Sequence, residues 1–134
     1  MKWIQGLLLM LWPLLGWAEP QPVYHVVLLT LKPSVTQQQS EQVMSDTLNM
    51  LKNIPGVLEV AVGNKARDDR PQHIKNYHLA ILVTLKSEAA LDVYGPHPEH
   101  RQFIAKHKDK FESFQVADFK RWGQVMTGVG TALE

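Results

Sequence analysis

One short stretch, from Tyr94 to Phe103, holds most of the side chains that could carry acid–base chemistry. It contains two histidines, a tyrosine and a glutamate within ten residues. Pro96 and Pro98 also belong to it, and they cannot both lie inside a regular helix. We therefore expect a helix that starts near Ser87 to break here, and a second helix to begin at Pro98.

The residues after the break recur three and four positions apart and so lie on one helical face. They are His100, Phe103, Ile104 and His107. An imidazole titrates near neutral pH, which makes His100 a candidate general base. Tyr94 or His25 would then donate a hydrogen bond to the oxygen of a developing enolate.

Two other interpretations of the stretch stay open. In a structural one, His97 caps the second helix and His100 forms a hydrogen bond with a strand residue such as Asp118. In the other, His97, Glu99 and His100 bind a metal ion, with His107 as a further ligand. Glu99 lies about 100° around the helix from His100, so these ligands converge poorly. We therefore expect no metal site and no cofactor, and no sequence feature favours haem.

The N-terminal residues have the composition of a secretory signal. Lys2 precedes an apolar run over residues 4–17, and Gly16 and Ala18 stand three and one residues before a cut after Ala18. Proline and glycine interrupt the run, which falls short of the roughly 20 apolar residues that a membrane span needs. We expect residues 1–18 to be removed, giving an exported, periplasmic or secreted protein without a membrane segment. An uncleaved anchor is the alternative.

The composition of the remaining chain excludes several classes of protein. Without Lys2, 13 Lys and Arg face 13 Asp and Glu, which argues against nucleic-acid binding. The absence of cysteine excludes disulfides, thiolate catalysis and zinc–thiolate sites. With 134 residues, 45% of them apolar, the chain is long enough for one packed domain. We expect that domain over residues 19–122 and a loose, glycine-containing tail over 123–134.

The hydrophobic pattern predicts the element order β-α-β-β-α-β. Strands are expected over residues 23–32, 57–62 and 77–86 and within 111–122, with helices from Thr36 to about residue 52 and on both sides of the break. Asp46 falls among the polar residues on the outer side of the first helix. This order is typical of a ferredoxin-like α+β sandwich, a four-stranded antiparallel sheet with two helices on one face.

The first and third strands are apolar on both faces, although helices cover only one. The side chains that would be left in water are Tyr24, Val26, Leu28, Ala80 and Leu82. An apolar surface of this size predicts a partner. A second copy, packed sheet against sheet around a two-fold axis, would close an α+β barrel, so we expect a homodimer.

Several short motifs occur together in these elements. They are His25-Val-Val-Leu-Leu-x-Leu-Lys32, Pro55-Gly56-Val57, Tyr77-x-x-Ala-x-x-x-x-Leu, Ser87-x-x-Ala-Leu-x-x-Tyr94-x-x-His97-Pro98-x-His100-x-x-Phe103 and Val116-x-Asp118-Phe119. In this combination the sequence resembles the stress-responsive α/β-barrel (Dabb) family over about residues 22–121. The resemblance implies a dimeric α+β barrel with a stress-associated or small-ligand-binding role.

A plant branch of that family consists of cofactor-free polyketide cyclases with a tyrosine and a histidine at the positions of Tyr94 and His100. The resemblance therefore implies these two as catalytic candidates. It places ten further residues on the face of a pocket between sheet and helices: His25, Val27, Leu29, Val43, Met44, Thr47, Ile81, Phe103, Val116 and Asp118. The sequence departs from the cyclases at Val43, Met44 and Thr47, where they carry bulky aromatic residues, so a shared polyketide substrate is not implied. We expect a small apolar or aromatic ligand, with a cofactor-free cyclase, lyase or isomerase activity as the alternative.

Overall fold

A computed structural model of the chain describes residues 20–128, so the expected signal peptide and the end of the tail lie outside the described residues. The elements confirm the predicted order. They are β1 (Val23–Leu31), α1 (Gln37–Leu51), β2 (Val57–Asn64), β3 (Leu79–Leu85), α2 (Glu88–Tyr94), α3 (Pro98–His107), the short 3-10 helix η1 (Lys108–Lys110) and β4 (Phe111–Lys120). The fold is the ferredoxin-like βαββαβ sandwich that the sequence predicts.

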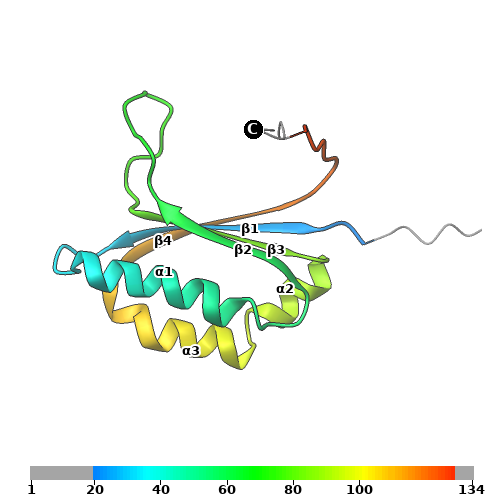
Figure 1. Cartoon of the computed structure of the whole chain (residues 1–134), viewed down its shortest axis with the longest axis horizontal. Helices are drawn as coiled ribbons and strands as arrows, with labels where there is room; N and C mark the ends of the chain where they lie inside the picture. Colours follow the sequence, from blue (N-terminus) through cyan, green and yellow to red (C-terminus); the bar gives the residue numbers. More distant parts are fainter. Residues whose placement is uncertain (1–19, 129–134) are drawn as a thin grey trace, which may run out of the picture.

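The four strands form one antiparallel sheet in the order β2-β3-β1-β4. Figure 1 shows α1, α2 and α3 together below this sheet, with the other face uncovered. The core lies between sheet and helices, and its most deeply buried members include Val43, Leu51, Leu79 and Leu85. The strand β4 stands at the edge of the sheet, and its side chains are exposed from Glu112 onward.

Local signals fix the helix boundaries. The Thr36 hydroxyl accepts a hydrogen bond from the Gln39 backbone N–H, and Oε1 of Gln39 accepts one from the Thr36 backbone N–H, a capping box that starts α1. The helix α3 ends at His107, and the next three residues tighten into η1. The helix that begins at Pro98 therefore ends in a tighter turn just before β4.

The prediction for Asp46 was wrong. This carboxylate lies on the buried side of α1 and is only 8% exposed, because α3 packs against the helix there and supplies hydrogen-bond donors. Helical periodicity indicates which side chains share a face, but it does not reveal which neighbour would compensate a buried charge.

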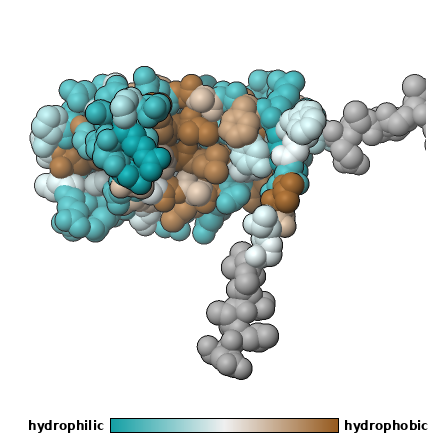
Figure 2. Space-filling model, turned by 90° about the horizontal axis from the view of Figure 1, so that it is seen from above, coloured by the Kyte–Doolittle hydropathy of each residue, from teal (hydrophilic) through white to brown (hydrophobic). Residues whose placement is uncertain are grey.

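The uncovered face of the sheet is apolar in its middle, as Figure 2 shows. The five residues predicted to line it are all half-buried: Tyr24, Val26, Leu28, Ala80 and Leu82. On this face the Tyr24 ring stacks on Phe119 with a centroid distance of 4.8 Å, and Phe119 stays 54% exposed. An apolar face of this kind remains available to a partner.

Two irregular segments border the sheet. The connection between β2 and β3 rises on the uncovered side (Figure 1) and holds the ion pairs Lys65–Asp68 and Arg67–Asp69. Residues 121–128 contain no helix or strand. Within the described part of the chain, no helix has both the length and the apolar character that a membrane span requires.

Gly56 provides a test of the turn between α1 and β2. Its φ of +88° favours glycine, and a Cβ at this position would stand 2.7 Å from the Cβ of Ala90. We expect Gly56→Ala to lower the free energy of unfolding by about 2 kcal/mol, measured by urea denaturation. Gly63→Ala is the matched control, because no atom lies within 4 Å of its added Cβ. Equal losses in the two variants would contradict this account of the turn.

Candidate functional site

The floor of the candidate site is formed by β1 and β4. Their antiparallel register sets His25 opposite Asp118, Val27 opposite Val116, and Leu29 opposite Phe114. Because side chains alternate along a strand, all of these residues point to the same face of the sheet. Five of them, all but Asp118, line a cavity together with residues of α2 and α3, so this face is the one that the helices cover.

The corner between α2 and α3 supplies the other polar groups. Ser87 caps α2, which ends at Tyr94. After a turn, Pro98 occupies the first turn of α3, and Nδ1 of His97 accepts a hydrogen bond from the Glu99 backbone N–H. The predicted break and the capping role of His97 are both present. The short turn is what brings the end of one helix next to the start of the other.

Tyr94 and His100 meet at this corner, with their ring centroids 4.6 Å apart. The Tyr94 ring also lies edge-on to His25, at 5.4 Å. Nδ1 of His25 is 2.6 Å from Oδ1 of Asp118. The rings of His25, Tyr94 and His100, from β1, α2 and α3, therefore form one cluster. Asp118 from β4 forms a hydrogen bond with the first of them.

Hydrogen bonds fix the tautomer of His100. Its Nδ1 lies 2.9 Å from the carbonyl oxygen of Gly95. A carbonyl oxygen can only accept, so in the neutral ring Nδ1 carries the proton and Nε2 keeps its lone pair. The alternative in which His100 pairs with Asp118 is not observed, because Asp118 bonds to His25 instead. His100 is thus arranged to take up a proton at Nε2.

Burial sets the charge states at the corner. It lowers the pKa of His100, an effect that the hydrogen bond to Gly95 partly offsets and that nearby His25 reinforces. Burial also raises the pKa of Tyr94 far above its ordinary value of 10.0. At neutral pH the site therefore pairs a neutral imidazole with a neutral phenol, one able to accept a proton and the other able to donate a hydrogen bond.

The cluster opens into a cavity of about 650 Å³ between the sheet and the helices. The cavity follows β1 and β4 away from His25, and its far part is bordered by Lys108, Glu112 and Ser113. Eight of the predicted site residues line it: His25, Val27, Leu29, Ile81, Tyr94, His100, Phe103 and Val116. Apolar side chains make up most of its wall.

Four predicted residues do not line the cavity. Asp118 does not line the cavity, but it contacts the site through its hydrogen bond with His25. Val43 and Thr47 are fully buried in the core, where the Thr47 hydroxyl bonds to the backbone carbonyl of Val43. Met44 packs at the margin of the core. These α1 residues miss the cavity because only the end of α1, at Leu51, reaches it.

Other cavity residues were missed by the sequence analysis. They are Leu51, Ile104, Lys108, Phe111, Glu112, Ser113 and Phe114. Strand alternation from Val116 already put Phe114 on this face, and helical spacing already linked Ile104 with His100. No sequence signal pointed to Lys108, Glu112 and Ser113, because they enter the wall where the chain turns from α3 into β4.

No group of three or more His, Cys, Asp or Glu side chains in residues 20–128 is arranged to hold a metal ion. Of the candidate ligands, Nδ1 of His97 is engaged in the helix cap. His107 points to α1 rather than to His100, since its Nε2 bonds to Asp46.

The fold and this corner define a ferredoxin-like α+β protein with a cavity between its sheet and its helices. Comparison with known sequences agrees with that class: the family described as "Stress responsive A/B Barrel Domain" (Dabb) matches residues 23–121. The chain belongs to the Dabb family.

Several known proteins are similar to this chain. Olivetolic acid cyclase from Cannabis sativa is 24% identical over 97 residues, which cover 72% of this chain and 94% of the cyclase. Hydroxynitrile lyase from Passiflora edulis has a similar structure, with a TM-score of 0.69 and 20% identity over 80% of this chain and 99% of the lyase. A dimeric ferredoxin-like protein of unknown function from Thermobifida fusca gives a TM-score of 0.66 and 23% identity, covering 77% and 93% of the two chains.

The charge state of His100 can be measured directly. Because burial lowers its pKa, we expect the ring to titrate with a midpoint below the 6.5 of a free imidazole. Two-dimensional NMR of the histidine ring signals over a pH series would give this midpoint, with His100→Gln used to assign the resonance. A midpoint at or above 6.5 would show that the ring is better solvated, or better paired with an anion, than its position indicates.

Proposed function

We propose that this protein binds a small apolar or aromatic ligand in the cavity between its sheet and its helices. The observation that carries the proposal is the cavity itself. Its volume of about 650 Å³ suits a small organic molecule. Its wall is mainly apolar, with polar groups at its two ends: His25, Tyr94 and His100 at the corner, and Lys108, Glu112 and Ser113 at the far end. A ligand with an aromatic or aliphatic body and a polar group at one or both ends would match this distribution.

We further propose that the functional unit is a homodimer formed through the uncovered sheet face. Its apolar middle, with Val26 and Leu82, would be shielded by a second copy in a two-fold arrangement. Related structures from the same fold class are described as dimeric. Sheet-to-sheet packing would leave the helix-covered face, and with it the cavity, on the outside of each protomer.

A second function, cofactor-free acid–base catalysis, is favoured by the neutral pair at the corner. Nε2 of His100 would take a proton from a carbon or hydroxyl of the ligand, while the Tyr94 hydroxyl donates to the oxygen that gains negative charge. The imidazolium would then return the proton to the product. The cyclase and the lyase named above show that catalysts occur among the proteins similar to this one.

Export is proposed on the sequence of the first 18 residues. A lysine, an interrupted apolar run and small residues before Ala18 fit a cleaved signal. A mature domain without cysteine needs no disulfide to fold in an oxidising compartment. Together with the family, these features fit an exported, stress-associated binding protein.

Native mass spectrometry of the protein purified from its own host tests three parts of this proposal at once. We expect a chain that begins at Glu19, a dimer, and additional mass from a bound organic molecule that leaves on denaturation. Val27→Phe would narrow the cavity and should reduce the additional mass. Leu58→Phe, at a side chain 61% exposed on β2, should retain it.

The three parts fail independently. A chain that keeps residues 1–18 would contradict cleavage, and a monomer would contradict the dimer. Undiminished additional mass in Val27→Phe would place binding away from this part of the cavity. Leu82→Glu serves as the dimer control, because a charge on the uncovered face should yield a monomer that still binds.

Catalysis is tested with the same protein. If His100 is a base, His100→Ala should lower turnover about 10²- to 10⁴-fold and leave ligand affinity nearly unchanged. Tyr94→Phe should also lower turnover, since it removes only the hydroxyl. The measurement is product formation from the recovered ligand and from an aromatic hydroxynitrile. His73→Ala, in the β2–β3 connection, is the control and should have no effect. Equal turnover in the wild type and both variants would leave binding as the only function.

A further inference from the structure

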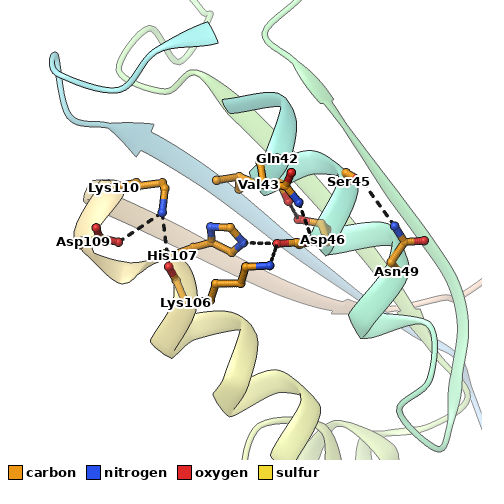
Figure 3. A network of polar contacts seen from close by, with 10 residues as sticks. Gln42, Val43, Ser45, Asp46, Asn49, Lys106, His107, Asp109 and Lys110 are labelled. Carbon is orange, nitrogen blue, oxygen red and sulfur yellow. Dashed lines mark hydrogen bonds and ion pairs between the residues drawn. The ribbon is translucent and has the colours of Figure 1, made fainter. Parts of the chain in front are cut away.

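A second titratable cluster joins α1 to α3, away from the corner described above (Figure 3). At its centre is His107, which is only 1% exposed. Nε2 of His107 lies 2.8 Å from Oδ2 of Asp46, and Nζ of Lys106 lies 2.7 Å from the same oxygen. The other carboxylate oxygen accepts a hydrogen bond of 2.9 Å from Gln42. One buried carboxylate thus holds two adjacent residues at the end of α3.

The carboxylate determines the tautomer of His107. An ionised carboxylate only accepts hydrogen bonds, so Nε2 must carry the proton and Nδ1 must be the bare nitrogen. Nδ1 is buried and has no hydrogen-bond partner among the described residues. Protonation would therefore create a buried N–H donor without an acceptor, and such a donor is costly.

The charges around His107 also oppose protonation. The charged groups that act on it are Asp46 from α1, Lys106 from α3 and Lys110 from η1. Lys106 already compensates the charge of Asp46, so an imidazolium would be a second cation on one carboxylate. Burial lowers the pKa of His107, and the bond to Asp46 only partly offsets this effect. For Asp46, burial alone would raise the pKa, but hydrogen bonds from Lys106, His107 and Gln42 outweigh it and lower the pKa.

These directions give the sign of the pH dependence. Because the folded chain resists protonation of His107, its contribution to stability is complete above the ordinary value of 6.5 and is lost as the pH falls below it. The contribution of Asp46 is lost only at pH values below its ordinary value of 3.8. In mild acid, protonation of His107, rather than of Asp46, therefore lowers the stability of this cluster.

The cluster is connected to the cavity wall. The His107 ring packs against Phe103 with a centroid distance of 5.2 Å, and Phe103 packs against Phe111 at 6.5 Å. Both phenylalanines line the cavity, as does Lys108, the next residue after His107. Leu51 lines it from the end of α1. A shift of the end of α3 away from α1 would therefore displace this part of the wall.

We propose that Asp46, Lys106 and His107 form an acid-sensitive latch that holds α3 against α1, and that protonation of His107 releases the end of α3 and opens this wall of the cavity. The latch acts on the helix pair alone. It does not depend on the identity of a ligand or on catalysis, so it stands or fails separately from the proposed function.

The chain lacks cysteine, which permits a direct test with a single introduced thiol. In Leu51→Cys the thiol would face the cavity beside α3, and in Leu85→Cys it would lie in the fully buried part of β3. The rate of labelling by a soluble disulfide reagent is measured at about pH 7.5 and about pH 5.5 and divided by the rate of the same protein unfolded in urea. This ratio removes the effect of pH on the thiolate.

We expect the corrected rate of Leu51→Cys to rise several-fold in acid and that of Leu85→Cys to stay constant. Adding His107→Gln should remove the rise, because the amide can still donate to Asp46 but cannot take up a proton. Adding His73→Gln, at a histidine outside the helices, should leave it in place. A parallel rise at both cysteines would indicate global unfolding and overturn the latch, as would a rise that survives His107→Gln.

A second variant keeps the test decisive if His107→Gln does not fold. Lys106→Gln removes a half-exposed cation that pairs with Asp46. An imidazolium at His107 would then be the cation that compensates this carboxylate, so its protonation would cost less. We expect this variant to lose most of the acid response. Hydrogen exchange of the otherwise unmodified protein provides an independent readout: amides of residues 98–110 should lose protection in acid before those of β1 and β3. An unchanged response in Lys106→Gln, or uniform loss of protection, would overturn the proposal.

Discussion

The antiparallel register of β1 and β4 is the constraint on which the site depends. It places His25 beside Asp118 and sets two apolar pairs, Val27 with Val116 and Leu29 with Phe114, along the floor of the cavity. Without a helix over its outer part, β4 contributes exposed residues such as Phe114 and Val116 to that floor. On the opposite side of the cavity, α2 supplies Tyr94 and α3 supplies His100. The edge strand β4 thus runs along the cavity and also supplies Asp118, the hydrogen-bond partner of His25.

Two buried polar arrangements serve different ends in this small domain. At the α2–α3 corner, hydrogen bonds to a carbonyl and to a carboxylate fix two imidazoles that line the cavity, His100 and His25. Between α1 and α3, the imidazole of His107 is turned into the protein and its second nitrogen is enclosed. In the proposals above, the first arrangement would exchange protons with a ligand, whereas the second would make helix packing sensitive to protons.

Local chemistry explains which features the sequence predicted. Pro96 and Pro98 break a helix wherever they occur, and alternation along β1 identifies its two faces without knowledge of the neighbours. The burial of Asp46 depends on Lys106 and His107, about sixty residues away along the chain, so no local pattern reveals it. The same limit applies to Val43 and Thr47. Their spacing correctly predicts burial, but whether they meet a cavity or a solid core depends on where α3 lies.

The alternation of β4 has a consequence for how this domain tolerates insertions. Successive residues of the strand serve two surfaces, so Asp118 belongs to the site while Phe119 stacks on Tyr24 of the uncovered face. Inserting or deleting one residue of β4 before Asp118 would exchange the side chains that face the helices with those that face the uncovered side. Asp118 would then place its carboxylate on the apolar face. The irregularity in the pairing lies at Thr30 and Leu31, opposite Ser113 and Phe111 at the end of the cavity far from His25, where it leaves this alternation intact. The length of β4 is therefore under as much constraint as its composition.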